Sequence, residues 1–353
     1  MILISNINNF IINIIRMGKK GKGKKKEKAK KVLPFVSICT PTFNRRPFIK
    51  TMIYCFNEQT YPKELMEWII IDDGEDKIED LIADHPNVKY FKYDTKMTLG
   101  KKRNTMHEKS KGDIIIYMDD DDYYPPCRVS HAVERLMSDK NALCAGSSEI
   151  FVYFNHIEQM YKFGPYSKNH ATAGTFAFKK ELLNLTKYNE EACLAEEKEF
   201  LKNYTIPFIQ LDSLKTILVF SHIHNTFDKK EIIPPEDTKF AKKSSVTPET
   251  FIKNEIILDF FKNIDKQLED YPLGSKNHKP DVIKQYNEMK MKRNMESQQT
   301  SIKMKNTGGE EKVLSNAEIV KIIHDLQEKN KRLENENKLL KEKLMTKEID
   351  ISH

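Results

Sequence analysis

Four consecutive aspartates, Asp119 to Asp122, are the side chains best suited to chemistry in this 353-residue chain. They follow an apolar run, Ile114 to Met118, which predicts a buried strand. Adjacent carboxylates repel one another and raise each other's pKa unless a cation is present. If the segment is strand-like, alternate residues face the same way, so we expect Asp119 and Asp121 to project together. Oxygen ligands of this kind suit Mg²⁺ or Mn²⁺ and predict a metal site; a solvated acidic turn is the alternative.

The segments around this cluster predict an α/β fold with a mostly parallel central sheet flanked by helices. The runs near 35–40, 68–71 and 114–118 are mainly apolar, residues 88–93 predict a further short strand, and segments with helical spacing lie between the strands. Strands that are apolar on both faces are typical of a sheet covered by helices on both sides. Ligands bind beyond the carboxyl ends of such strands, where Thr40–Thr42, Asp72–Asp73 and Asp119–Asp122 would converge. We therefore expect a binding site at that edge.

A basic segment, Lys101 to Arg103, precedes the aspartates at the start of an expected helix. A guanidinium there, facing a metal–carboxylate edge, suits a diphosphate. An ordinary basic helix surface is the alternative. A Gly-rich phosphate loop, which a nucleotidyltransferase would carry after its first strand, is absent from TPTFNRR.

The ordered motifs VSICTPTFNRR, WIIIDDGED, GKKRNTMHEKSKGDIIIYMDDDDYYPP and AEEKEFL resemble those of family 2 glycosyltransferases with the A-type fold. The resemblance covers about residues 33–228. It implies transfer of a sugar from a nucleotide-sugar donor, usually a UDP-sugar, to an acceptor hydroxyl with inversion. It also implies Mn²⁺ or Mg²⁺ as cofactor.

The same resemblance implies roles for individual residues. The residues implied to bind the nucleotide-sugar are Pro41, Thr42, Asp73, Arg103, Asp119, Asp120 and Asp122. The residues implied to bind the metal ion are Asp119 and Asp121, of which Asp121 is the more direct ligand. His222 or His224 would complete the coordination of the ion. Arg128 completes the D-x-D-D-x-x-P-P-x-R pattern, and Ala173 to Ala177 would line the acceptor and sugar pocket.

An inverting transfer needs a general base for the acceptor hydroxyl. Glu196 and Glu197 resemble the acidic pair that supplies it, and Glu197 matches the second member, with Glu in place of Asp. An acidic first turn of a helix is the alternative. Two His at a spacing of two, His222 and His224, would point the same way on an extended segment.

The net charge of +7 is concentrated near the start of the chain. Residues 18–31 hold nine Lys and one Glu, and such a run predicts a disordered tail that could contact an anionic membrane peripherally. Residues 1–16 are too polar for a confident span or secretory signal, and Met17 is an alternative start. Five Cys without a C-x-x-C pair favour a reducing, cytoplasmic setting without secretion.

Four expected parts follow from these patterns: 1–31, the apolar start and Lys-rich tail; 32–265, the catalytic domain; 266–314, a polar linker; and 315–348, a parallel coiled coil. Ile319, Leu326, Leu333 and Leu340 recur every seven residues, with Asn330 and Asn337 at the other seam position. This pattern favours a parallel homodimer. The stretch before the coil is acidic and contains Gly, which disfavours sequence-specific DNA binding.

Two functions remain open from the sequence. One is a metal-dependent glycosyltransferase of unspecified acceptor: glycan, protein or lipid. The other is a catalytically degenerate scaffold that binds a nucleotide or glycan and self-associates through the coil. The bias toward Lys, Asn and Ile is typical of an AT-rich genome and favours a large DNA virus or a protist as source, with host cytoplasm as the location if viral.

Overall fold

The computed structural model describes residues 32–194, 197–299, 303–305 and 311–351. The chain divides into two compact units, residues 1–275 and residues 276–353. Residues 1–17 and the Lys-rich segment lie outside the described residues. The predictions of a disordered tail and of an alternative start at Met17 rest on these residues. No helix among the described residues is long and apolar enough to cross a membrane.

The first unit is built on a seven-stranded sheet in the order β3-β2-β1-β4-β8-β5-β9. Its strands are β1 (Val36–Thr42), β2 (Met66–Asp72), β3 (Val88–Lys92), β4 (Ile114–Tyr117), β5 (Cys144–Gly146), β8 (Ala177–Lys179) and β9 (Phe208–Gln210). The neighbours β3, β2, β1 and β4 run parallel, whereas β8 is antiparallel to β4 and β5. The expected α/β class with a mostly parallel central sheet is confirmed.

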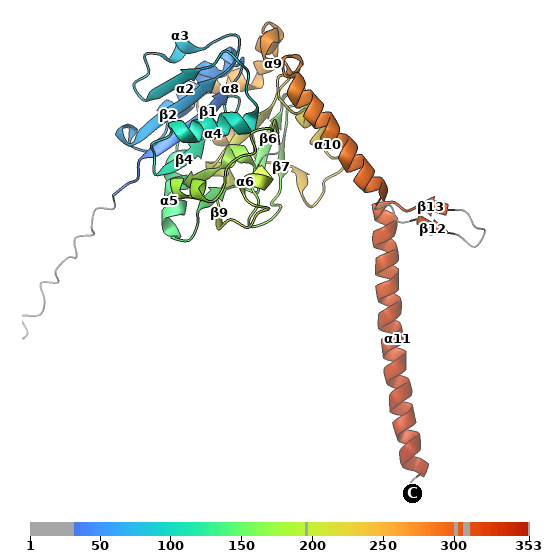
Figure 1. Cartoon of the computed structure of the whole chain (residues 1–353). Coiled ribbons are helices and arrows are strands. Elements are labelled where there is room, and N and C mark those ends of the chain that lie inside the picture. The colour runs from blue at the N-terminus through green and yellow to red at the C-terminus, as the bar shows by residue number, and fades with distance from the viewer. Residues whose placement is uncertain (1–31, 195–196, 300–302, 306–310, 352–353) are drawn as a thin grey trace, which may run out of the picture. The chain divides into compact units, whose positions relative to one another are not determined.

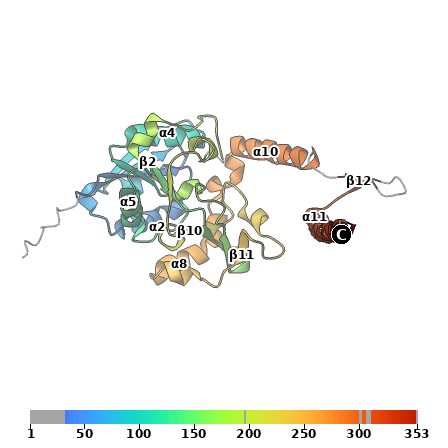
Figure 2. The same cartoon turned by 90° about the horizontal axis from the view of Figure 1, so that it is seen from below.

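Helices cover this sheet and connect its strands (Figure 1). They are α2 (Ile49–Asn57), α3 (Glu79–Ile82), α4 (Leu99–Lys109), α5 (Arg128–Ser138) and α6 (Glu197–Phe200). The view from below separates α4 and α5 to different sides of the sheet (Figure 2). β2 is buried along its whole length because it has a helix-covered face on each side, which explains its run of apolar residues.

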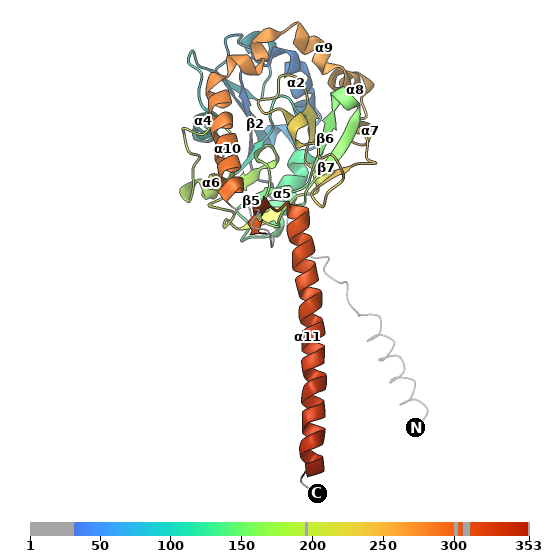
Figure 3. The ribbon, with the colours of Figure 1, turned by 90° about the vertical axis from the view of Figure 1, so that its right-hand side faces the viewer.

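A second, four-stranded sheet has the order β10-β6-β7-β11. It consists of β6 (Ile150–Phe154), β7 (Gln159–Phe163), β10 (Leu218–Ser221) and β11 (Ala241–Lys243). Three further helices follow in the chain, α7 (Pro248–Phe251), α8 (Glu255–Lys262) and α9 (Ile264–Glu269). The helical spacing of residues 251–261 therefore corresponds to α8 and the end of α7 (Figure 3).

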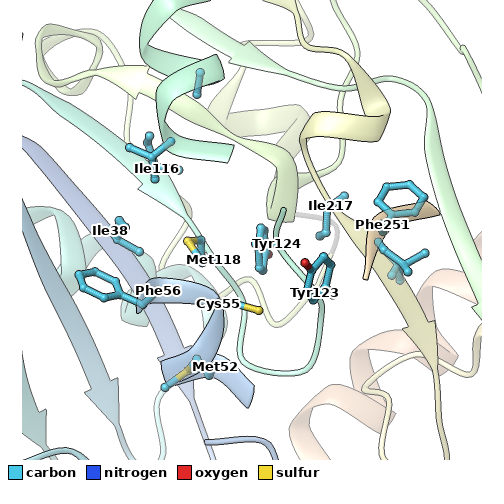
Figure 4. Close-up of a cluster of buried hydrophobic side chains, with 14 of the residues drawn as sticks. Ile38, Met52, Cys55, Phe56, Ile116, Met118, Tyr123, Tyr124, Ile217 and Phe251 are labelled. Carbon is cyan, nitrogen blue, oxygen red and sulfur yellow. The ribbon is translucent and has the colours of Figure 1, made fainter. Parts of the chain in front are cut away.

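The main hydrophobic core joins the two sheets close to the aspartates. Figure 4 shows Ile38 and Ile116 of the large sheet near Met118, Tyr123 and Tyr124, which flank the acidic segment. Tyr123 also exchanges backbone hydrogen bonds with Leu218 of β10, at 3.0 and 2.9 Å. The acidic turn is therefore fixed at both ends by buried side chains and by the second sheet.

The second unit contains α10 (Pro280–Gln299), the hairpin β12 (Lys303–Lys305) and β13 (Glu311–Val313), and α11 (Asn316–Ile351). Residues 266–314, expected to be a polar linker, thus include the 20-residue helix α10. The sequence of this helix is mostly polar, so it lacks the apolar periodicity from which a helix is predicted. Ser315 and Glu318 begin α11 as a capping box: the N–H of Glu318 donates to Ser315 Oγ at 3.3 Å, and the N–H of Ser315 donates to Glu318 Oε2 at 2.9 Å. The domain boundaries remain predictions.

Candidate active site

The four aspartates lie at the carboxyl edge of the parallel strands, as expected. β4 ends at Tyr117 beside β1, and the two strands run parallel. Asp120 and Asp121 form a turn, so the alternation expected of a strand does not hold there. Asp119 and Asp121 contact different cations, Arg103 and Arg45, and their common direction remains a prediction.

Arg45 lies among the aspartates, at the end of the loop that follows β1. Its NH2 group is 3.3 Å from Asp121 Oδ2, and its Nε is 3.6 Å from Asp120 Oδ1. The Arg45 side chain is only 4% exposed, so the pair is shielded from water and from salt. Sequence reasoning did not assign Arg45 a role, although its position just after TPTFN, at a strand end, was the available signal.

His222 contacts the same carboxylate from the second sheet. Its Nε2 lies 3.2 Å from Asp121 Oδ2 and 2.8 Å from Asn225 Nδ2. The segment is a turn, closed by the hydrogen bond from the N–H of Asn225 to the carbonyl of His222 at 3.1 Å. The expectation of an extended segment is therefore wrong, because residues 222–225 form a turn. His224 lies against Gly274, where an added Cβ would be 2.7 Å from His224 Nδ1.

Burial and charge set the protonation of this cluster. Burial raises the pKa of Asp121, but the charge of Arg45 and the contact with His222 outweigh it and hold that pKa well below its usual value. Burial and the negative charge of Asp121 raise the pKa of Asp122 well above its usual value. Burial lowers the pKa of His222 to about 3. At neutral pH the cluster thus presents an ionised Asp121 beside a neutral imidazole.

Asp119 faces a different cation, Arg103 of α4. The distance between Arg103 NH1 and Asp119 Oδ1 is 3.8 Å, and the guanidinium carbon lies 4.4 Å from the centre of the Tyr117 ring. The N–H of Asp119 donates to the Tyr124 hydroxyl at 2.7 Å. Gly174 approaches from the opposite segment, since an added Cβ there would lie 2.8 Å from Asp119 Oδ2. These contacts fix the position of the Asp119 carboxylate.

Asp73 is buried beneath the site, with no exposed side-chain surface. It forms an ion pair with Lys102, and its Oδ2 accepts a hydrogen bond from the N–H of Met97 at 2.5 Å. Lys102 also donates to the carbonyl of Thr42 at 2.9 Å, while the half-buried Pro41 lies next to Thr42 in β1. The expected contact of Asp73 with the base of a nucleotide remains a prediction.

Glu197 begins α6 and is half-buried. The other predicted base, Glu196, lies outside the described residues. The preceding loop is held against α4 by two hydrogen bonds at 3.0 Å, from Asn104 Nδ2 to the carbonyl of Tyr188 and from the N–H of Tyr188 to Asn104 Oδ1. A third bond of 2.9 Å runs from the N–H of Gly100 to the carbonyl of Ala192. The helix that carries Arg103 therefore also positions the loop that leads to Glu197.

Arg128 is fully buried and supports the segment that contains Gly174. Its NH2 group donates to the carbonyls of Thr175 at 2.7 Å and Phe176 at 2.9 Å. Burial lowers the pKa of Arg128 to about 10, which leaves it charged at neutral pH. Arg128 thus holds the backbone that borders Asp119.

Within the part of the chain that the structure describes, no group of three or more His, Cys, Asp or Glu side chains is arranged to hold a metal ion. At Asp121 the neighbouring cation is Arg45. The metal-ligand predictions for Asp119, Asp121, His222 and His224 remain predictions.

The fold and this site describe an α/β domain with acidic and basic side chains gathered at the carboxyl edge of a parallel sheet. Residues 37–203 match the family model described as glycosyl transferase family 2. An "Uncharacterized glycosyltransferase" of Haemophilus influenzae is 25% identical over 240 residues, 63% of this chain and 90% of the relative. Glycosyltransferase AglE of Haloferax volcanii is 30% identical over 94 residues, 25% of this chain and 31% of the relative. These matches support a family 2 glycosyltransferase domain and a transferase enzyme.

Two solved structures are similar to the chain. The mannosyltransferase PcManGT from Pyrobaculum calidifontis, in complex with GDP-Man and Mn²⁺, has a TM-score of 0.43 and 16% identity over 53% of this chain. TarS 1–349 of S. aureus, in complex with UDP-GlcNAc, has a TM-score of 0.41 and 18% identity over 52% of this chain. The chain spans 57% and 58% of these two solved chains.

Proposed function

We propose that this chain is a metal-dependent glycosyltransferase that moves a sugar from a nucleotide-sugar to an acceptor hydroxyl with inversion. The observation that carries the proposal is the convergence of Asp119, Asp121 and Arg103 at the carboxyl edge of the sheet. UDP-sugars are the first donors to test, because UDP is the commonest donor nucleotide in the family that the motifs resemble.

Asp121 and His222 fit a divalent cation, because a carboxylate oxygen and a neutral imidazole nitrogen lie 3.2 Å apart. Asp119 is the third ligand that we propose, and its carboxylate would have to approach the other two, since these three side chains are not grouped as a metal site in the described structure. A bound Mn²⁺ or Mg²⁺ would supply positive charge to the departing nucleoside diphosphate. Arg103 supplies a further positive charge at the same edge, and its contact with the Tyr117 ring fixes the direction of its guanidinium.

Glu197 is the general base of this proposal. It accepts the proton of the acceptor hydroxyl as that oxygen attacks the anomeric carbon on the face opposite the leaving group, which gives inversion. Its half-buried position at the start of α6 leaves the carboxylate accessible to an acceptor. Glu196 is the alternative base.

A donor-hydrolysis and transfer assay with Mn²⁺ across UDP- and GDP-sugars tests the proposal. We expect at least one donor to turn over, and Asp121→Asn to reduce the rate by about 100-fold or more, the usual scale for loss of an electrostatic group at a transition state. If no donor turns over in any metal, a scaffold that binds nucleotide or glycan becomes the better description.

We also propose that a second copy of the chain pairs with α11 in a parallel coiled coil. Leu326, Leu333 and Leu340 are 56, 45 and 57% exposed, which is unusual for a regular leucine stripe. Lys329 and Glu334 of opposite copies would attract, as would Glu336 and Lys341. Leu333→Asp should convert a dimer to a monomer in light scattering, while Glu328→Gln, on the opposite face of the helix, should not; equal masses for both variants would contradict the dimer.

The location that we propose is the cytoplasm, supported by five free cysteines at positions 39, 55, 127, 144 and 193. Peripheral attachment to an anionic membrane through the Lys-rich segment is part of the same proposal. The binding of the chain to anionic vesicles should weaken when salt is added.

A further inference from the structure

A row of four aromatic side chains extends across the surface of the first unit: Phe240, Tyr166, His170 and Tyr204, here called the aromatic row. The rings of Tyr166 and Phe240 stack, with centres 5.6 Å apart. The centres of Tyr166 and His170 are 5.0 Å apart, and those of His170 and Tyr204 are 5.3 Å apart. Tyr166 is 45% exposed and Phe240 41% exposed, so part of each ring is open to solvent, and Lys239 Nζ lies 5.4 Å from the centre of the Phe240 ring. Neither ring belongs to the site described above.

The backbone beneath the row is held in place from several directions. The N–H of Gly164 donates to the carbonyl of Phe240 at 2.8 Å, which connects the two outer segments. Gln210 Nε2 donates to the carbonyls of Lys168 at 2.8 Å and His170 at 2.9 Å. Asn169 Nδ2 donates to the carbonyl of Tyr204 at 3.1 Å. These contacts hold the backbone that carries the rings, which reduces the backbone entropy that would be lost on binding.

The row leads toward the proposed catalytic residues at one end. Tyr204 lies in the turn that ends the short helix beginning at Glu197, where the N–H of Leu201 donates to the carbonyl of Glu197 at 2.9 Å. Burial raises the pKa of Tyr204, and the negative charge of Glu197 raises it further. His170 is four residues before Gly174, which borders Asp119.

The chemistry of the row suits a sugar ring. An aromatic face carries a negative quadrupole that attracts the weakly positive C–H groups on one face of a pyranose. Burial lowers the pKa of His170, so at neutral pH it is an uncharged ring like its neighbours. Ser167, Lys168 and Asn169 border the rings and offer hydrogen-bonding groups for sugar hydroxyls.

A cavity of about 420 Å³ elsewhere in the unit has a mainly apolar lining that includes Leu33, Tyr61 and Met137. It lies next to the segment that enters β1 at Val36, which is the amino end of that strand. The aspartates are at the carboxyl edge of the same sheet. An apolar acceptor in this cavity would therefore be at the wrong edge for transfer, which favours the aromatic row as the acceptor site.

We propose that the aromatic row is the acceptor subsite and binds a pyranose ring of a glycan. This inference rests on the proposed transferase function, and it names the substrate class of the same site: a carbohydrate acceptor held by ring stacking, with its hydroxyl directed toward Glu197.

Saturation-transfer NMR on the full chain tests binding directly, with cellobiose, chitobiose and α-1,2-mannobiose as probes in the presence of Mn²⁺ and UDP. We expect ring-face protons of at least one disaccharide to receive saturation, and Tyr166→Ala with Phe240→Ala to weaken its binding by about 10-fold, which is the scale of one to two lost aromatic contacts. Tyr166→Phe keeps the ring and should keep binding within about twofold. Ile256→Ala, a change at a 79% exposed residue outside the row, is the matched control for handling and folding.

Turnover gives a second readout with the disaccharide that binds. The double alanine variant should raise the KM for that acceptor while the KM for the donor stays unchanged, because the row does not border the diphosphate residues. The proposal is overturned if no disaccharide binds the unmodified chain, or if the alanine variant binds it equally well. It is also overturned if n-octyl glucoside receives saturation on its alkyl chain and none on its sugar, since the occupant would then be apolar. Binding that depends on the row without any turnover would count against the transferase function and leave the glycan subsite intact.

Discussion

Arg45 and Asp121 are 76 positions apart in the sequence, yet the guanidinium NH2 group lies 3.3 Å from the Asp121 carboxylate. Asp120 is the second carboxylate beside the same guanidinium, at 3.6 Å. A buried cation in this place keeps the acidic turn compact, because it offsets the repulsion between neighbouring carboxylates. It also stands where a divalent cation would have to bind Asp121.

Arg45→Ala should therefore increase the affinity of the chain for Mn²⁺ in the absence of donor. Removal of one positive charge beside Asp121 lessens the repulsion that an arriving Mn²⁺ meets, and we expect the dissociation constant to fall by about 10-fold or more. Titration of free Mn²⁺ by electron paramagnetic resonance measures this constant without any turnover.

Arg45→Lys is the matched control, since it retains the positive charge beside Asp121. Its dissociation constant for Mn²⁺ should stay close to that of the unmodified chain. A weaker affinity for Mn²⁺ in Arg45→Ala would contradict the competition and indicate that Arg45 instead orients Asp121 for the metal.

Glu197→Gln should reduce kcat by about 100- to 10,000-fold, the usual contribution of a general base, because the amide cannot accept the proton of the acceptor hydroxyl. The affinity for donor nucleotide should change little. Glu199→Gln provides the control, since Glu199 is an exposed carboxylate on the same short helix. Equal rates for Glu197→Gln and Glu199→Gln would remove Glu197 from the mechanism.

Gly174→Ala should weaken donor binding without unfolding the chain. The new methyl group would lie 2.8 Å from Asp119 Oδ2, so the carboxylate must move away from its position beside Arg103. The end of a side chain can shift cheaply, and we expect a loss of about 1 kcal/mol in the free energy of unfolding. Isothermal titration with UDP and Mn²⁺ measures the binding; unchanged affinity would show that the position of Asp119 is not critical.

The strands, the order of the elements and the acidic cluster could all be predicted from sequence, for a physical reason. Buried parallel strands must be apolar on both faces, so β1, β2 and β4 stand out, and polar residues that follow them must reach one edge. The contact between Arg45 and Asp121 could not be predicted, because it depends on how two loops from different strands fold over one another. The turn at His222 to Asn225 was missed for a similar reason, since it depends on the Asn225 side chain, whose Oδ1 accepts from the N–H of His222 and whose Nδ2 contacts His222 Nε2.

Acid should destabilise the chain partly through His107. This side chain is buried against Tyr117, with its Nε2 2.6 Å from the tyrosine hydroxyl, and burial lowers its pKa to about 3, with a further contribution from Arg103. A His whose pKa is lower in the folded state contributes its full stability above the unfolded pKa, near 6.5, and loses it as the pH falls toward about 3.

His107→Gln should remove this part of the pH dependence. Between about pH 6 and pH 4, the free energy of unfolding of the unmodified chain should fall more steeply than that of the variant, by up to about 1.4 kcal/mol per pH unit. Urea denaturation at a series of pH values provides the comparison. Parallel curves for the two proteins would contradict the burial of a neutral His107.

The central claim is that Asp121 serves metal-dependent sugar transfer, and the most direct measurement compares the unmodified chain with Asp121→Asn in a transfer assay across UDP- and GDP-sugars, with and without Mn²⁺. Our account predicts turnover of at least one donor by the unmodified chain, loss of that turnover when Mn²⁺ is chelated, and a rate lower by about 100-fold or more in Asp121→Asn. Turnover that persists in the chelator and is equal in the variant would contradict it.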